Sequence, residues 1–347
     1  MVNIEEIKEK IKEKEYDFLR TEKILGDNIM FLTLGGSKAY GTDIETSDTD
    51  IRGCAAQNMS SLLGLRTSYE KNNFEQVIDT ATDTVVYGFN KFVELLLICN
   101  PNIIEMLGCK PEHYIQMDKR GKLLLDNSAL FLSKKAIVSF GGYATAQLRR
   151  LTNALARDAY TQSEKEKHIY DSCCNILNTF DDRYAKFDGG SINLYIDKAS
   201  REEMETEIYA DINLKHYPLR SMQGIFAELS NVIREYEKVG KRNHKKDELH
   251  LNKHAMHLIR LYLMGCDILE QGKIITYREK DLDLLMGIRN GKYMNEDGKY
   301  KPEFFELVDS MEKRWKYAAE NTNLPKTPDY KKVNELFMEI ISMSLGR

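Results

Sequence analysis

The chain has 347 residues, of which 42% are hydrophobic and 30% are charged, and its formal net charge is −4. This composition is ordinary for a globular protein and excludes a fibrous or wholly disordered chain. The negative net charge also excludes attraction to nucleic acid by the protein as a whole, so any contact with RNA needs a local basic segment.

The N-terminal third predicts a helix followed by a small sheet. Residues 3–20 place isoleucines at helical spacing among Glu and Lys, which predicts an exposed amphipathic helix. Three segments then read as strands: Asn28–Leu34, Thr49–Gln57 and Phe74–Thr82. A short helix capped by Ser37 is expected after the first strand, and a longer helix is expected to open at Asp83.

Strand patterns nearly disappear after about residue 130. Four long helical patterns replace them: Ser133–Arg157, Glu164–Phe180, Ser221–Lys238 and Lys253–Gln271. Two apolar segments between residues 192 and 219 are the exception and predict a β-hairpin. We therefore predict an α+β protein with a small mixed β-sheet domain over residues 1–130 and a mostly α-helical domain over residues 131–347.

Residues 35–53 hold the most informative motif, a glycine-serine turn followed by Asp48 and Asp50. On a β-strand these two aspartates would point the same way, ~7 Å apart along the chain. Two carboxylates at this spacing can share divalent metal ions. Backbone N–H groups after Gly36 would face a phosphate, although the turn taken alone also fits an ordinary strand-to-helix connection.

The chain resembles the polymerase-β-type nucleotidyltransferase superfamily, whose mark is Gly-Ser, a spacer, Asp-x-Asp and a third carboxylate on a later strand. Within it, the sequence is most similar to the family named for its association with RNA ligases in RNA repair. The motifs that carry this likeness are Ser37-x-Ala-Tyr-Gly41, Ser47-Asp-x-Asp-x-Arg-Gly53, Asp83-Thr-Val-Val-Tyr87 leading to Lys91-Phe, Asn100-Pro-Asn-x-x-Glu105, Phe140-x-x-Tyr-Ala-x-x-Gln-Leu-Arg149 and Lys253-His-x-x-His-Leu-Ile-Arg260.

The resemblance implies an enzyme that moves a nucleoside monophosphate from an NTP such as ATP to an acceptor hydroxyl and releases pyrophosphate. Two Mg²⁺ ions, or Mn²⁺ in their place, are expected on Asp48, Asp50 and a third carboxylate. The resemblance places the third carboxylate at the end of the third strand, where Asp83 is our first choice and Asp79 the second.

The same resemblance suggests which residues hold the nucleotide. We expect Gly36 and Ser37 to bind the β and γ phosphates, Lys38 to add positive charge and Tyr40 to pack beside the nucleotide. In the helical part, three polar residues fall on one face of an apolar helix: Lys253, His257 and Arg260. This face either binds phosphate or forms salt bridges with acidic neighbours, and the sequence leaves both interpretations open.

The acceptor is less well defined than the donor. The family likeness makes an RNA end the first choice, with the basic segment at residues 238–246 as an RNA contact or as a merely solvated loop. Three alternatives remain: an adenylyltransferase acting on a small molecule, an antitoxin-like enzyme modifying a partner protein, and a nucleotide-binding protein without catalysis.

Cellular location follows from two absences in the sequence. The N-terminus lacks the apolar core of a signal peptide, and no apolar run reaches the ~20 residues that span a bilayer. Six cysteines occur without a Cys-x-x-Cys spacing, which disfavours a zinc site. We therefore expect a cytoplasmic protein without a membrane partner, and the sequence predicts no oligomeric state.

Overall fold

The computed structural model describes residues 4–57, 74–159, 162–178, 191–202, 204–241, 248–296 and 299–345. The chain forms two compact units: one consists of Met1–Gln147 and Ala255–Arg347, the other of Leu148–His254. These units do not divide at residue 130, and the domain boundary expected there stays a prediction. The predicted α+β class is confirmed, because one mixed sheet lies in the N-terminal part and helices follow it.

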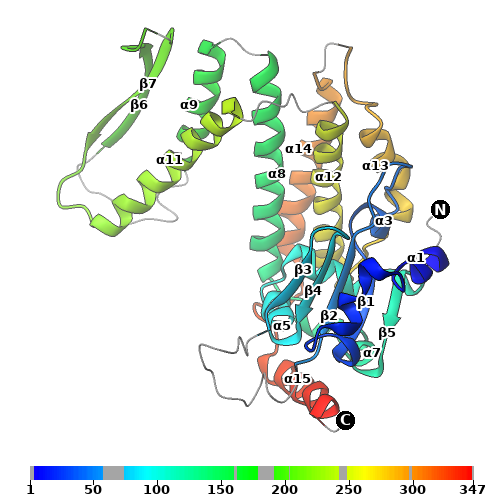
Figure 1. The fold of residues 1–347 in the computed structure, drawn as a ribbon. Helices are drawn as coiled ribbons and strands as arrows, with labels where there is room; N and C mark the ends of the chain where they lie inside the picture. Colours follow the sequence, from blue (N-terminus) through cyan, green and yellow to red (C-terminus); the bar gives the residue numbers. More distant parts are fainter. Residues whose placement is uncertain are drawn as a thin grey trace. The chain divides into compact units, whose positions relative to one another are not determined.

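A five-stranded sheet organises the first unit, in the order β3-β4-β2-β1-β5 (Figure 1). Its strands are β1 (Ile29–Leu34), β2 (Ile51–Ala55), β3 (Gln76–Asp79), β4 (Thr84–Gly88) and β5 (Tyr114–Met117). Strands β2 and β4 are parallel and the other neighbours are antiparallel. All six residues of β1 are buried, which explains why this strand reads as a continuous apolar run instead of an alternating one.

Two hydrophobic cores lie against this sheet. One joins β1 and β2 to the N-terminal helices α1 (Ile4–Lys10) and α2 (Phe18–Thr21). The other joins them to α5 (Phe89–Leu97), α6 (Pro101–Ile104), α7 (Lys119–Asp126), α8 (Lys135–Ala159), α12 (Glu248–Gln271), α14 (Pro302–Asn321) and α15 (Tyr330–Leu345). Two shorter helices, α3 (Gly36–Tyr40) and α13 (Leu282–Arg289), belong to the same unit. Single 3-10 turns occur at Lys14–Tyr16, Gly26–Asn28, Glu105–Leu107, Pro111–His113, Ser128–Phe131 and Glu279–Asp281.

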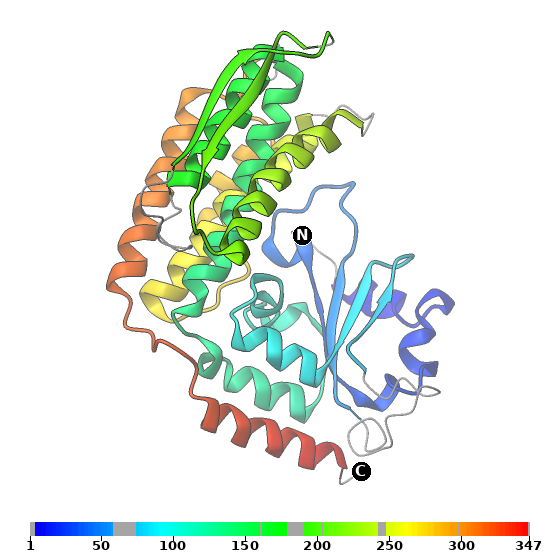
Figure 2. The same cartoon turned by 90° about the vertical axis from the view of Figure 1, so that its left-hand side faces the viewer.

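The second unit contains the predicted β-hairpin, which is confirmed as β6 (Ser191–Lys198) paired antiparallel with β7 (Thr206–Asn213). Figure 2 shows the hairpin beside α9 (Gln162–Asn178) and α11 (Leu219–Lys241). Its inner side packs on a small core centred on Ile169, Cys173 and Val232. An isolated pair of strands is only marginally stable in water, so the packing of this hairpin on the small core stabilises it.

Two predicted elements differ from the structure. Asp83 does not open a helix: it precedes β4, where β-branched residues alternate between buried and half-buried, and the helical spacing begins only at Phe89. The N-terminal helix is also broken after α1. Arg20 stabilises the chain after this break, because its guanidinium binds the carbonyls of Ile11 and Lys12, just beyond the end of α1, at 2.7 and 3.1 Å.

Candidate functional site

The glycine-serine turn brings backbone and carboxylate together at the end of β1. Gly36 has a φ of 55°, and a Cβ placed on it would lie 2.0 Å from Oδ2 of Asp50. The backbone N–H of Gly35 also donates to the carbonyl of Asp50 at 2.8 Å. Glycine is therefore required at position 36 both by the left-handed backbone and by the approach of the carboxylate.

The N-cap of α3 differs from the expectation. Gly35 occupies the N-cap position and Gly36 begins the helix, so Ser37 lies within the first turn and does not cap it. Ser37 and Lys38 are both half-buried there. Their expected contacts with the triphosphate stay predictions.

Parallel pairing of β2 with β4 places Asp50 and Asp83 side by side. Ile51 pairs with Thr84 in the register of these strands, and the N–H of Ile51 donates to the carbonyl of Asp83 at 3.2 Å. Each aspartate is the residue just before its strand. The two acids consequently meet at the N-terminal ends of these neighbouring strands, although they are distant in sequence.

Arg52 binds both of these carboxylates with a single nitrogen. Its Nη2 lies 2.8 Å from Oδ1 of Asp50 and 3.1 Å from Oδ1 of Asp83. The side chain of Asp50 is 21% exposed and that of Asp83 is 53% exposed, so both carboxylates remain open to solvent. Two converging carboxylates repel each other, and the guanidinium between them supplies the compensating positive charge.

The structure treats the other two candidate acids differently. Asp48 is exposed, lies in the segment before β2 and forms no ion pair with any described residue. Asp79 ends β3, and its Oδ1 accepts the backbone N–H groups of Ala81 and Thr82 at 3.0 and 3.3 Å. Asp83 is not on the third strand, where the resemblance places the third carboxylate: it lies in the β3–β4 turn with a φ of 47°.

Carboxylate oxygens are the donors that Mg²⁺ and Mn²⁺ prefer, and Asp50 and Asp83 meet around one cationic nitrogen. This pair fits a divalent cation in donor type and in convergence. Over the described ranges, however, no three His, Cys, Asp or Glu side chains are grouped as metal ligands. Asp48 is thus not brought to the pair in this structure, and the three-ligand set stays a prediction.

A buried polar network holds Tyr40 at the end of α3. The hydroxyl of Tyr40 donates to Oε1 of Glu105 at 2.8 Å, and Nη1 of Arg260 donates to Oε2 of Glu105 at 3.1 Å. The guanidinium of Arg260 also lies 3.6 Å from the centre of the Tyr40 ring, within the range of cation–π attraction. Burial raises the pKa of Tyr40 well above its usual value, so this hydroxyl remains a donor at neutral pH.

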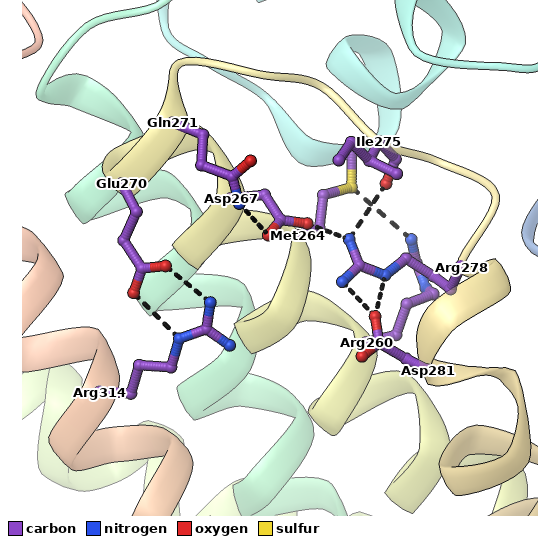
Figure 3. Close-up of polar contacts among 9 residues, drawn as sticks. All are labelled: Arg260, Met264, Asp267, Glu270, Gln271, Ile275, Arg278, Asp281 and Arg314. Atoms are coloured by element: carbon purple, nitrogen blue, oxygen red, sulfur yellow. Dashed lines mark hydrogen bonds and ion pairs between the residues drawn. The ribbon is translucent and has the colours of Figure 1, made fainter.

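A second network fixes the backbone of the same residue. Figure 3 shows Arg278 between Asp267 of α12 and Asp281, and both carboxylates bind its guanidinium. The backbone N–H of Arg278 donates to the carbonyl of Tyr40 at 3.2 Å. Tyr40 is therefore attached at both its hydroxyl and its carbonyl, which gives α3 a fixed position beside the carboxylates.

The helix face expected to bind phosphate is only partly in contact with this network. Lys253 is exposed and His257 is half-buried with its ring edge-on to Tyr40, while Arg260 is buried. Arg260 forms the salt bridge that was the alternative interpretation, and phosphate binding by the three residues stays a prediction. Of the basic segment at residues 238–246, residues 242–246 lie outside the described residues.

Two contributors to the site received no role from sequence reasoning. Arg52 lies inside the Asp-x-Asp-x-Arg motif, two residues from Asp50, so strand alternation already placed it near that acid. Glu105 closes the Asn-Pro motif, and its partner Arg260 lies 155 positions further along the chain. A single sequence offers no signal for that second pairing.

One of three comparisons with known proteins finds a match, and it covers the N-terminal part of the chain. No curated protein matches the chain, and no solved structure matches it. None of the helices in the described residues is long and apolar enough to cross a membrane. Residues 5–170 match the model of the RNA repair pathway DNA polymerase beta family, which confirms the resemblance to polymerase-β-type nucleotidyltransferases of RNA repair that the motifs predict.

Proposed function

We propose that the protein is a metal-dependent nucleotidyltransferase that moves a nucleoside monophosphate from an NTP to an acceptor hydroxyl and releases pyrophosphate. The observation that carries this proposal is the convergence of Asp50 and Asp83 on one cationic nitrogen, directly beside Gly36. Two converging carboxylates can hold the divalent cations that such a transfer uses, because its barrier falls through positioning and charge compensation on the phosphate. The family match supports nucleotidyl transfer as the general activity.

The residues around the pair have complementary roles in this proposal. Asp48, Asp50 and Asp83 would hold Mg²⁺ or Mn²⁺, which supplies charge compensation on the transferred phosphate and the leaving pyrophosphate. Gly36 and Ser37 would orient the β and γ phosphates. The helix α3 that carries them is held in place at Tyr40, its last residue, by hydrogen bonds with Glu105 and Arg278.

An RNA end is the acceptor that we propose first, because the description of the matching family names an RNA repair pathway. Lys253 and the basic segment at residues 238–246 would contact its phosphates. NTPs and RNA ends are both available in the cytoplasm, so the proposal keeps the cytoplasmic location expected from the sequence.

The test is a screen for pyrophosphate release with each of the four NTPs, Mg²⁺ or Mn²⁺, and three acceptor classes: oligoribonucleotides, small molecules with hydroxyl groups, and candidate proteins. We expect turnover only with RNA, and turnover with another class would transfer the proposal to the corresponding alternative. Asp48→Ala and Asp50→Ala should abolish transfer without unfolding the protein, because both side chains reach solvent. Asp126→Ala removes an exposed acid from the surface pair with Lys122 and serves as the control. Full turnover in Asp50→Ala would refute the proposal.

One observation favours a second candidate, a nucleotide-binding protein without catalysis. Arg52 occupies the position between Asp50 and Asp83, so the positive charge that a metal would supply is already present. A protein of this kind would bind NTP yet release no pyrophosphate with any acceptor. Its NTP affinity would also be the same with and without divalent cations, whereas the enzyme should bind NTP more tightly when they are present.

A further inference from the structure

The arginines buried in the described part of the chain are Arg120, Arg260, Arg278 and Arg289. The first three each bind a carboxylate. Arg120 pairs with Asp118 at 2.7 Å, Arg260 pairs with Glu105 at 3.1 Å, and Arg278 pairs with Asp267 and Asp281 (Figure 3). These pairings follow the general rule that a buried charge needs a partner of opposite charge.

Arg289, the last residue of α13, departs from this rule. It is 8% exposed, and among the described residues its Nη2 donates to the hydroxyl of Ser47, at 3.2 Å. Its Nη1 is buried and has no hydrogen-bond partner in the residues that the structure describes, and no ion pair forms there. Burial lowers the pKa of Arg289, and the nearby negative charge of Asp43 opposes that effect without forming a salt bridge. A guanidinium nevertheless remains charged in proteins. Arg289 is therefore a buried cation to which no carboxylate of the described residues is bound.

Two further orphaned groups lie around the same segment, residues 41–48. Oγ1 of Thr42 and Nδ1 of His113 are both buried without a hydrogen-bond partner among the described residues. Arg289 contacts this segment through Ser47, and the negative charge of Asp43 acts on the pKa of both His113 and Arg289. The ring of His113 meets Tyr277, and a Cβ at Gly41 would lie 2.5 Å from that same ring.

We infer that Arg289 and Ser47 form a binding site for a phosphate group of the substrate, beside Asp48. The guanidinium offers an unused donor, Nη1, in the planar geometry that suits phosphate oxygens. Ser47 already accepts hydrogen bonds from the N–H of Ile44 at 2.9 Å and from Arg289, so its own proton can be donated to an anion. That the anion belongs to the substrate rests on the proposed function, because Ser47 immediately precedes Asp48.

The deciding experiment uses Arg289→Met, with Arg120→Met as the matched control, in the full-length protein without divalent metal. Inorganic phosphate is the probe, and its affinity is measured from the rise in Tm with phosphate concentration. We expect the phosphate affinity of Arg289→Met to fall at least tenfold, while its Tm in phosphate-free buffer stays the same or rises because a buried unpaired charge is gone. Arg120→Met should behave oppositely, with a lower Tm and wild-type phosphate affinity, since it leaves Asp118 unpaired.

Ser47→Ala provides a milder second variant and should weaken phosphate binding severalfold. Wild-type phosphate affinity in Arg289→Met would overturn the inference and leave Arg289 a purely structural residue. Asp50→Ala separates this inference from the proposed function. It should keep the phosphate response even though transfer is lost, and a protein that fails every transfer assay can still carry the phosphate site.

The source of the phosphate is identified by two further ligands tested on wild type and Arg289→Met. A nonhydrolysable NTP analogue represents the donor, and a short oligoribonucleotide with and without a terminal phosphate represents the acceptor. A loss of affinity confined to the analogue assigns the site to the triphosphate. A loss confined to the phosphorylated oligonucleotide assigns it to the RNA end, and equal affinities of wild type and variant for all these ligands would contradict a substrate role.

Discussion

Arg52 reaches Oδ1 of Asp83 with its Nη2 nitrogen at 3.1 Å, across 31 positions of sequence. The same nitrogen holds Asp50, so one cation links two acids that arrive from different strands. A divalent cation bound by both acids would have to compete with this guanidinium. The strength of that competition should be measurable, because all three side chains are at least partly exposed to solvent.

Arg52→Met removes the competing charge. We expect Mn²⁺ to bind about two- to thirtyfold more tightly to this variant, since each of the two partly exposed ion pairs contributes roughly 0.2–1 kcal/mol. Mn²⁺ titration followed by electron paramagnetic resonance measures the affinity directly. Arg314→Met breaks a pair with Glu270 and should leave Mn²⁺ binding unchanged. If Arg52→Met bound Mn²⁺ no better than the wild type, competition between Arg52 and metal would be excluded.

Gly36→Ala should disturb the carboxylate site directly. The new Cβ would overlap Oδ2 of Asp50, and the left-handed backbone costs a residue with a Cβ roughly 1–2 kcal/mol. We expect a lower free energy of unfolding in urea together with loss of pyrophosphate release.

Gly142→Ala is the matched control for this change. A Cβ there meets no atom within 4 Å, and the residue lies inside the helix α8. It should therefore stabilise the protein by about 0.5–1 kcal/mol and leave activity unaltered. Equal effects of the two substitutions would show that position 36 has no special relation to Asp50.

Glu105→Ala tests the buried network below α3. Removing this carboxylate leaves Arg260 buried without its counter-charge, so we expect a loss of about 3–5 kcal/mol in the free energy of unfolding. Glu94→Ala breaks a surface pair with Lys91 and should cost less than about 0.5 kcal/mol. A small effect in both variants would mean that Arg260 finds another partner.

The stability of the protein should decrease in mild acid, in part through His113. Burial lowers the pKa of His113 below its usual 6.5, so the unfolded chain binds a proton more readily than the folded one. The contribution of His113 is thus complete above about pH 6.5 and is lost as the pH falls through the lower folded pKa.

His113→Asn removes this titration. Urea unfolding at pH 7.5 and pH 5.0 should show a smaller drop in stability for the variant than for the wild type. Other groups account for the drop that remains, among them His168, whose pKa burial also lowers. An identical drop in both proteins would show that His113 does not contribute.

Sequence patterns predict the elements of this fold better than their junctions. The strand β1 is predicted from its continuous apolar run, because all of its residues are buried. The hairpin of the second unit and the long helices are predicted from their patterns of apolar residues. The helix predicted to begin at Asp83 is an example of a junction that the sequence pattern predicts wrongly. The apolar neighbours of Asp83 continue from β4 into α5, so a helical count started at Asp83 includes a strand.

In the candidate site, contacts within one short motif can be predicted from the sequence, whereas contacts between distant parts of the chain cannot. Asp50, Gly36 and Arg52 lie within one short motif, so local spacing brings them together. Arg289 meets Ser47 across 242 positions, and Arg260 meets Glu105 across 155. Such contacts arise only when the last helices pack onto the sheet, and a single sequence has no periodic pattern that records them.

The position of Asp83 in a hairpin turn has a consequence for how this site can be altered. Its carbonyl is fixed by Ile51 in the sheet, whereas the direction of its carboxylate depends on the turn that begins at Asp79. Lengthening this turn by one residue would redirect the acid while every strand kept its register. The distance between the carboxylate of Asp83 and a bound ion can thus be changed without changing the pairing of the strands in the sheet.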